Sequence, residues 1–340
     1  MNPGGPNPDR ERIRESATFW HADVVRIQVA QEYLFDQSPV DSSYVAELDS
    51  QVSLANSLGM IAIVTLQEQP FNGPPLPDAS AIRFWQFMAG HYKNSPGVFF
   101  DLYNQPHLKT YQGENWMWNI WRNGGAVDAQ GPPPVHDTFV GMQTLVNDIR
   151  SEGADNVIVV EGNKTGHDLS GIPQYALTGS NVTYGMDPTL GSTDQTPAQW
   201  AANWGNLSDS VPVMMEAFQD WPGANNCNPN SPTLLPMLLA YLRSKNLGLI
   251  VWSLDGGNII VGSNLEEPTS YEGTTTQPCT GGTTYPPHPP KNGSKSPTSG
   301  PGNPPTGGSQ TQATPPTGTP DTIGPGALIL DFFRVNSPGG

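Results

Sequence analysis

Short apolar runs alternate with amphipathic stretches along most of the chain, and this alternation restricts its fold more than any other feature. The runs have the length and the β-branched composition of buried strands. Seven strands are predicted, at residues 23–29, 60–66, 98–103, 156–160, 181–186, 211–216 and 249–254. Strands that alternate with helices build parallel sheets from βα units. At 340 residues the chain can form one large barrel of this kind.

The stretches between the strands carry signals for helix ends. Helices are predicted at residues 9–20, 41–58, 78–93, 137–152, 232–246 and 327–335. Asp41 and Asp78 suit N-caps, and Gly59 and Gly153 suit helix C-termini. Because a barrel begins with a strand and this chain begins with a helix, we expect an α/β fold, a (β/α)₈ TIM barrel that lacks its first strand. Such a chain reads as truncated at its N-terminus and leaves two strand edges unpaired.

The segment at 273–320 is rich in Pro, Gly, Ser and Thr and cannot support a packed core. We predict a disordered insertion before the last helix, within a single domain that spans residues 1–340. Cys227 and Cys279 lie in loop-like segments, so either a disulfide between two loops or two unpaired thiols is compatible with the sequence. Neither cysteine has the neighbours of a metal site, and no metal or cofactor is expected.

The formal net charge of −16, with only 15 Lys and Arg residues, disfavours partners that are polyanions. We therefore expect no nucleic acid and no membrane as a partner, whereas neutral sugars remain compatible. No apolar stretch reaches the length of about 18 residues that a membrane span needs. The first ten residues, MNPGGPNPDR, lack the cationic start and apolar middle of a signal peptide.

Polar and aromatic residues stand at the ends of three predicted strands. The strand at 98–103 is followed by NQPH, which contains Asn104 and Gln105. Glu216 ends the strand at 211–216, and Trp252 lies in the strand at 249–254. Because reactive groups of barrels lie at the C-terminal ends of the strands, these side chains are predicted to meet at one rim.

The segment DLYNQPH resembles the fourth-strand signature of glycoside hydrolase family 5, the cellulase-like retaining β-glycanases, in which Asn-Glu-Pro follows an aromatic residue. It departs from that signature at Gln105, where the family has its acid/base glutamate. Arg26 in DVVRIQV matches the strand-two arginine of the family. The resemblance covers roughly residues 9–265 and 323–336. It implies a cofactor-free enzyme that hydrolyses O-glycosyl bonds of a β-linked polysaccharide or oligosaccharide with retention, secreted and monomeric.

The resemblance also assigns roles at the rim. Glu216 would be the nucleophile, Asn104 would hydrogen-bond the sugar 2-hydroxyl, and Trp252 would form the floor of a sugar subsite. Arg26 would keep Glu216 ionised through charge pairing. Gln105 has no acidic proton to donate, and general acid–base help is typically worth ~10²–10⁴-fold.

Two explanations for Gln105 remain open. The chain could be a pseudoenzyme that binds carbohydrate without turnover, or another carboxylate could donate the proton. Asp187 and Glu68 are the candidates for that donor. Asp187 begins Asp-Pro-Thr where the family has His-x-Tyr, and Gln67 occupies the position of the strand-three histidine.

Ordinary structural roles compete with each of these assignments. Arg26 could pair with a surface acid, Asn104 could cap a turn, Glu216 could be a solvated strand end, and Trp252 could fill the barrel core. Three tryptophans, Trp116, Trp118 and Trp121, fall in an expected loop after the strand at 98–103, where they could stack on sugar rings or anchor the loop. An unrelated barrel enzyme such as an aldolase is disfavoured, because no lysine ends a predicted strand.

Overall fold

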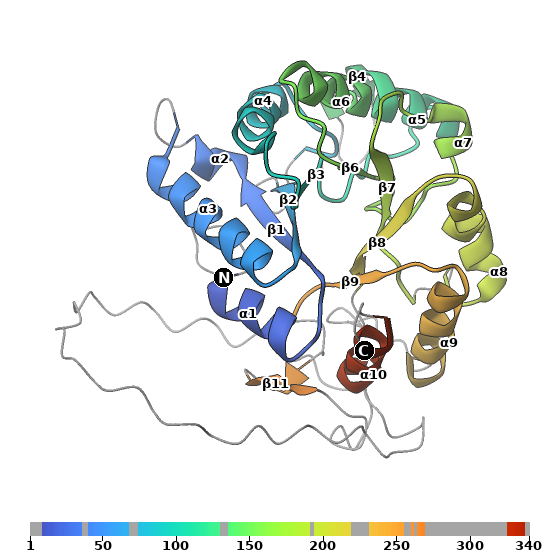
Figure 1. Cartoon of the computed structure of the whole chain (residues 1–340). Helices are drawn as coiled ribbons and strands as arrows, with labels where there is room; N and C mark the ends of the chain where they lie inside the picture. Colours follow the sequence, from blue (N-terminus) through green and yellow to red (C-terminus); the bar gives the residue numbers. More distant parts are fainter. Residues whose placement is uncertain are drawn as a thin grey trace, which may run out of the picture.

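A seven-stranded parallel sheet forms the centre of the molecule, in the strand order β1-β2-β3-β6-β7-β8-β9. The computed structural model describes residues 9–35, 40–67, 74–129, 135–190, 194–218, 231–254, 260–261, 264–268 and 325–336. The strands of the sheet are β1 (Val24–Ala30), β2 (Ile61–Gln67), β3 (Val98–Asp101), β6 (Ile158–Glu161), β7 (Val182–Met186), β8 (Val213–Phe218) and β9 (Leu249–Val251). Figure 1 shows the sheet curled into a ring with helices outside it. The prediction of a parallel barrel with seven strands is confirmed.

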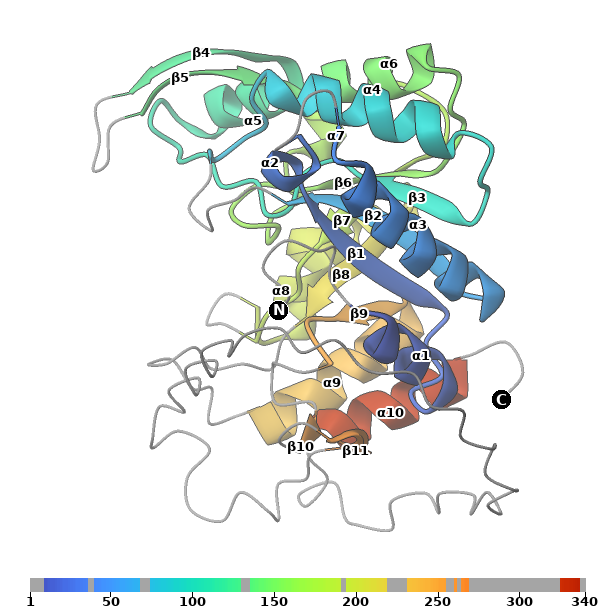
Figure 2. The same ribbon diagram turned by 90° about the vertical axis from the view of Figure 1, so that its left-hand side faces the viewer.

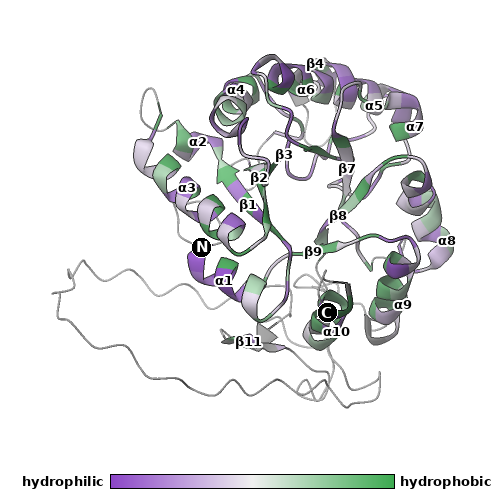
Figure 3. Cartoon of the chain, in the orientation of Figure 1, coloured by the Kyte–Doolittle hydropathy of each residue, from purple (hydrophilic) through white to green (hydrophobic). Residues whose placement is uncertain are grey.

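The outer layer consists of helices, most of which follow a strand along the chain. They are α1 (Arg10–Thr18), α2 (Gln31–Leu34), α3 (Ser42–Ser57), α4 (Ser80–Tyr92), α5 (Glu114–Asn123), α6 (Met142–Ser151), α7 (Ile172–Tyr175), α8 (Pro197–Trp200), α9 (Ser231–Ser244) and α10 (Pro325–Asn336). Asp9 and Asp41 cap α1 and α3 with their side chains, as helix N-caps do. Many of these helices show a green and a purple side, as amphipathic helices around a sheet should (Figure 3).

The structure corrects three of the predicted elements. Residues 137–140, predicted as the start of a helix, belong to an antiparallel hairpin of β4 (Gly124–Ala129) and β5 (Val135–Val140) beside α5 (Figure 2). The β-branched and aromatic residues of the segment favour a strand, and the hairpin pairs its backbone. The segment with the three tryptophans, which was predicted to be a loop, is helix α5. Helix α4 begins two residues after Asp78, which accepts a hydrogen bond from the N–H of Ser80 at 2.8 Å.

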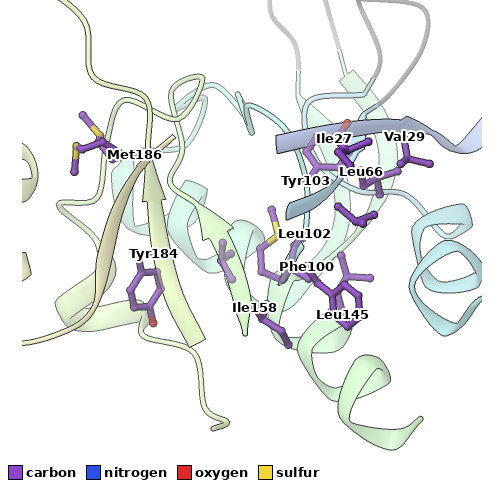
Figure 4. Close-up of a cluster of buried hydrophobic side chains, with 14 of the residues drawn as sticks. Ile27, Val29, Leu66, Phe100, Leu102, Tyr103, Leu145, Ile158, Tyr184 and Met186 are labelled. Atoms are coloured by element: carbon purple, nitrogen blue, oxygen red, sulfur yellow. The ribbon is translucent and has the colours of Figure 1, made fainter. Parts of the chain in front are cut away.

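Buried apolar side chains fill the space between the sheet and the helices. Ile27, Phe100 and Ile158 come from three different strands and are fully buried, together with Leu145 of α6 (Figure 4). Burial of each such side chain is worth about 1.5–3 kcal/mol relative to exposure. This packing fixes the strands, and with them the polar residues at the strand ends.

The ring is open between β1 and β9, the two ends of the sheet. Helices α1 and α10 lie on this side of the ring (Figure 1). A cavity of about 400 Å³ occupies the opening, lined by β1, β8 and β9 and by side chains that include Trp20 and Phe332. Within the described residues the barrel therefore has seven strands and is nearly closed.

A second hairpin, β10 (Ile260–Val261) with β11 (Asn264–Pro268), lies beneath α1 and α10 (Figure 2). The indole N–H of Trp20 donates to the carbonyl oxygen of Leu265 at 2.7 Å and ties this hairpin to the end of α1. None of the described helices is long and apolar enough to cross a membrane. The predicted insertion at 273–320, the two cysteines and Glu68 lie outside the described residues.

Candidate active site

A buried arginine organises the polar centre of the barrel. Arg26, in the middle of β1, donates to Oδ2 of Asp101 from Nε at 3.0 Å and from Nη2 at 2.5 Å. Its Nη1 donates to Oδ1 of Asn104 at 3.0 Å, and its Nη2 also donates to Oε1 of Glu161. Burial acts to lower the pKa of Arg26, but the surrounding carboxylates outweigh it and raise that pKa well above its usual value. Arg26 therefore stays charged and draws several strand ends together.

Glu216 points into this centre from β8 and has no exposed surface. Its Oε2 is 3.8 Å from Nη2 of Arg26, and no described donor hydrogen-bonds either of its oxygens. Burial, followed by the charge of Asp101, raises the pKa of Glu216 well above its usual value despite the opposing effect of Arg26. Arg26 was expected to keep Glu216 ionised. It does lower the pKa of Glu216, but burial raises that pKa by more.

The neighbouring strand leaves room for Glu216 at one glycine. A Cβ atom on Gly185 of β7 would lie 2.5 Å from Oε2 of Glu216 and 3.2 Å from Cγ of Glu161. The first separation is too short for real atoms and the second is a tight contact, so any side chain at this position would displace the carboxyl group of Glu216. The local sequence of β7 therefore helps to set where Glu216 lies.

Gln105 lies above the centre with a left-handed backbone, at φ 56°. Its backbone N–H donates to Oε2 of Glu161 at 2.6 Å, and its side-chain Nε2 donates to Oδ2 of Asp187 at 3.0 Å. A non-glycine residue in this region carries a cost of the order of 1–3 kcal/mol and persists only where its surroundings determine it. The two carboxylates supply such surroundings.

Asp187 follows β7 directly and is almost fully buried. Burial raises its pKa, against the lowering effects of Arg26 and of the Gln105 hydrogen bond. Its second oxygen, Oδ1, has no hydrogen-bond partner among the described residues. The expectation that Asp187 lies beside the Gln105 side chain agrees with these contacts, whereas Glu68 lies outside the described residues.

Glu161 belongs to the same cluster, and the sequence reasoning missed it. It ends β6, has no exposed surface, and accepts hydrogen bonds from Arg26 and from Gln105. Burial, followed by the charge of Asp187, raises its pKa well above its usual value. The signal that could have found it is an acidic residue at the end of an apolar run. The predicted strand stopped one residue short, at Val160, and left Glu161 in a loop.

Two further expected residues lie nearby. Asn104 is half-buried and accepts from Arg26, so it is held within the cluster instead of only capping a turn. Trp252 comes directly after β9, is partly buried, and lines the open-side cavity together with Glu216. Gln67 does not contribute a charge; its Oε1 accepts from Nε2 of Gln28 at 3.0 Å.

Two of the three tryptophans of α5 are packed inside the protein. Trp118 and Trp121 are buried, and the indole N–H of Trp121 donates to the backbone oxygen of Glu161 at 3.1 Å. Burial excludes both rings from stacking on a sugar in this arrangement. Trp116 is only partly buried and packs edge-on against Tyr111.

Comparison with known proteins places this site in a family. Residues 4–258 match the family model described as Cellulase (glycosyl hydrolase family 5). The chain belongs to glycosyl hydrolase family 5. The prediction of a cellulase-type glycoside hydrolase is thereby confirmed at the level of the family.

Relatives of this family 5 chain include two endoglucanases. Endoglucanase N of Pectobacterium atrosepticum is 24% identical over 243 residues, which are 69% of this chain and 47% of the relative. Endoglucanase 5 of Pectobacterium carotovorum subsp. carotovorum is also 24% identical over 243 residues, which are 69% of this chain and 41% of that relative. The chain therefore spans less than half the length of these two curated relatives.

Solved structures of similar fold include two enzymes of this type. A beta-glucanase from Saccharophagus degradans superposes with a TM-score of 0.58 at 19% identity, over 78% of this chain and 81% of that structure. An endocellulase from Pyrococcus horikoshii superposes with a TM-score of 0.57 at 14% identity, over 78% of this chain and 83% of that structure. At these identities the likeness shows a shared fold.

Proposed function

We propose that the chain hydrolyses the O-glycosyl bonds of a β-linked glucan with retention, and that Glu216 is the nucleophile. The observation that carries this proposal is the position of Glu216 on β8, close to the buried Arg26 that also holds Asn104, in a barrel of family 5. The names of the relatives, which are endoglucanases, support a glucan as the substrate. The acidic net charge supports a neutral partner, and we extend the proposal to a monomer that acts outside the cell.

The proposed roles follow from the contacts of each residue. Asn104 is fixed by Arg26 and can hydrogen-bond the sugar 2-hydroxyl, and Trp252 at the cavity can contact a sugar ring. Glu216 attacks the anomeric carbon and is active only when ionised. Because the pKa of Glu216 is raised, the rate on a substrate that needs no acid should increase as pH rises through that pKa.

Gln105 decides which substrate tests the nucleophile. Its amide cannot protonate a leaving oxygen, whereas a substrate with a good leaving group needs no acid and should react whichever group assists the hydrolysis of polysaccharide. The test is to measure hydrolysis of dinitrophenyl β-cellobioside and of soluble β-glucan by the unmodified protein and by Glu216→Gln. We expect turnover of the activated substrate that Glu216→Gln abolishes, with an anomer-retained product. Turnover that survives Glu216→Gln would refute the assignment of the nucleophile.

A second candidate function is carbohydrate binding without turnover. The observation that favours it is the neutral Gln105 at the acid/base position of the family signature. In that case neither substrate is hydrolysed, and cello-oligosaccharides still bind in a calorimetric titration. Hydrolysis of dinitrophenyl β-cellobioside that depends on Glu216 would exclude it.

A further inference from the structure

Glu161 brings a second carboxyl group close to Glu216. Asp101, Glu161 and Glu216 each have a carboxylate oxygen within 4.8 Å of the others. In retaining glycosidases the two reacting carboxyl groups lie about 5–5.5 Å apart. Asp187 is not part of this set. Among the described residues Glu161, unlike Asp101, also accepts a hydrogen bond from residue 105. Glu161 is therefore the carboxyl group near Glu216 that we consider for the reaction.

Glu161 also contacts the backbone of Gln105, the residue at the acid/base position of the family signature. The backbone N–H of Gln105 contacts Oε2 of Glu161 directly, so this carboxyl group is adjacent to the residue whose side chain would normally donate the proton. A glycine gives it space on the other side: a Cβ atom on Gly166 would lie 3.0 Å from Oε2 of Glu161 and 3.0 Å from Cγ of Asp187. The loop after β6 thus admits a carboxyl group beside Gln105.

The charge of the cluster requires that it keep a proton. Asp101, Glu161, Asp187 and Glu216 are all buried around the single guanidinium of Arg26. Four ionised carboxylates would leave a formal charge of −3 without solvent, and like charges in such a site cannot all ionise. With a proton on Glu161, its carboxyl group can hydrogen-bond Glu216, whose oxygens otherwise have no described donor. The raised pKa of both glutamates agrees with a shared proton.

We propose that Glu161 is the general acid and base that replaces the missing carboxyl at position 105, an inference that rests on the proposed function. In the first step the proton of Glu161 moves to the glycosidic oxygen as its bond to the anomeric carbon breaks and an ester bond to Glu216 forms. In the second step water attacks that carbon, the ester bond breaks, and the water proton returns to Glu161. Neither glutamate has exposed surface, so binding of the saccharide must displace the segment around Gln105 that covers Glu161.

A fluorinated substrate separates the two steps. Dinitrophenyl 2-fluoro-β-cellobioside should label Glu216 without acid help, because its leaving group needs no proton, and hydrolysis of the label then needs a base. We compare the unmodified protein with Glu161→Gln, Asp187→Asn and the control Glu114→Gln, an exposed residue paired with Lys164 at 3.2 Å. Mass spectrometry follows both the labelling and the loss of the label.

We expect Glu161→Gln to be labelled at close to the unmodified rate and to lose the label about 10²–10⁴-fold more slowly. Labelling itself shows that the variant is folded. In Glu161→Ala, added azide should restore turnover and give a β-glycosyl azide, which a purely structural role of Glu161 does not predict. Glu114→Gln should behave like the unmodified protein.

Three results would overturn the inference. Loss of the label at the unmodified rate in Glu161→Gln would show that Glu161 is not the base, and so would a larger loss of rate in Asp187→Asn than in Glu161→Gln. Failure of azide to restore turnover in a labelled Glu161→Ala variant would have the same meaning. If the unmodified protein is not labelled at all, the proposed function is refuted, and the inference with it.

Discussion

The backbone N–H of Gln105 and Oε2 of Glu161 are hydrogen-bonded at 2.6 Å, so the neutral residue of the family signature lies directly on a buried carboxyl group. The same glutamine donates its side-chain amide to Asp187. A residue that cannot carry charge thereby bridges two acidic groups. The predictions below use this arrangement and the space around it.

Replacement of Gln105 with glutamate should lower stability. The new carboxyl group would face Oδ2 of Asp187 across the present 3.0 Å hydrogen bond. At pH 8 the two like charges repel, whereas at pH 4 one of them can hold a proton and donate it. The melting temperature of Gln105→Glu should therefore fall more at pH 8 than at pH 4. Adding Asp187→Asn restores a donor and an acceptor, so the double variant should recover most of the loss; a loss that is independent of pH would contradict this account.

Glu216→Gln should raise stability at neutral and alkaline pH. The folded state holds the proton of Glu216 more tightly than the unfolded chain does, because its pKa is raised. The free energy of unfolding of the unmodified protein should therefore decrease as pH rises from the usual glutamate pKa, about 4.3, through the raised value. A glutamine has no such titration. Calorimetric melting at pH 5 and pH 8 should show an advantage of the variant that grows with pH, and Glu114→Gln should show none.

Gly185→Ala should impair the reaction more than the fold. The added Cβ would meet Oε2 of Glu216 at 2.5 Å, and the end of that side chain must move. A displacement of about 1 Å at a reacting group can cost 10²-fold in rate. We expect about this loss of kcat on dinitrophenyl β-cellobioside. The control Gly90→Ala lies in α4, where a Cβ meets only ordinary contact at 3.7 Å, and should retain the rate while gaining about 0.5–1 kcal/mol of stability.

Gly171→Ala should destabilise the region around α5. An added Cβ would lie 2.2–2.4 Å from ring atoms of the buried Trp118, which cannot move without disturbing the core. Overpacking of this kind typically lowers the free energy of unfolding by about 1–3 kcal/mol, and we expect a loss in that range. Denaturant unfolding measures it. Gly248→Ala is the matched control, because nothing lies within 4 Å of the added atom, and equal stability of the two variants would show that Trp118 is less constrained than its burial indicates.

The sequence was sufficient for the parallel strands, because most of them are mainly apolar runs with buried residues on both faces. It was insufficient where local patterns conflict with tertiary pairing. The segment at 135–140 could be assigned to a helix until its pairing with β4 is known. Helix α5 begins after Gly113 without a side-chain cap, so the usual start signal is absent.

The candidate site was predictable in part from strand ends. Asn104 and Glu216 were expected at one rim, and Arg26 and Asp187 were expected near them from the family resemblance; their contacts or neighbours place the four in one cluster. The inclusion of Glu161 depended on a strand boundary that differed by one residue. The protonation of the cluster could not be inferred from sequence, because it depends on burial and on how many carboxylates share one guanidinium.

The opening of the ring leaves β9 at an edge of the sheet, where strands separate most readily. Strand β9 has only three residues, borders the opening, and meets β8 with a register shift between Met215 and Phe218. A strand that is bonded along one side alone separates at a smaller free-energy cost than one held on both sides. Glu216 lies inside that irregular junction, so its alignment depends on a short strand at the edge of the sheet, and partial denaturation should abolish activity before the remaining strands lose their amide protection.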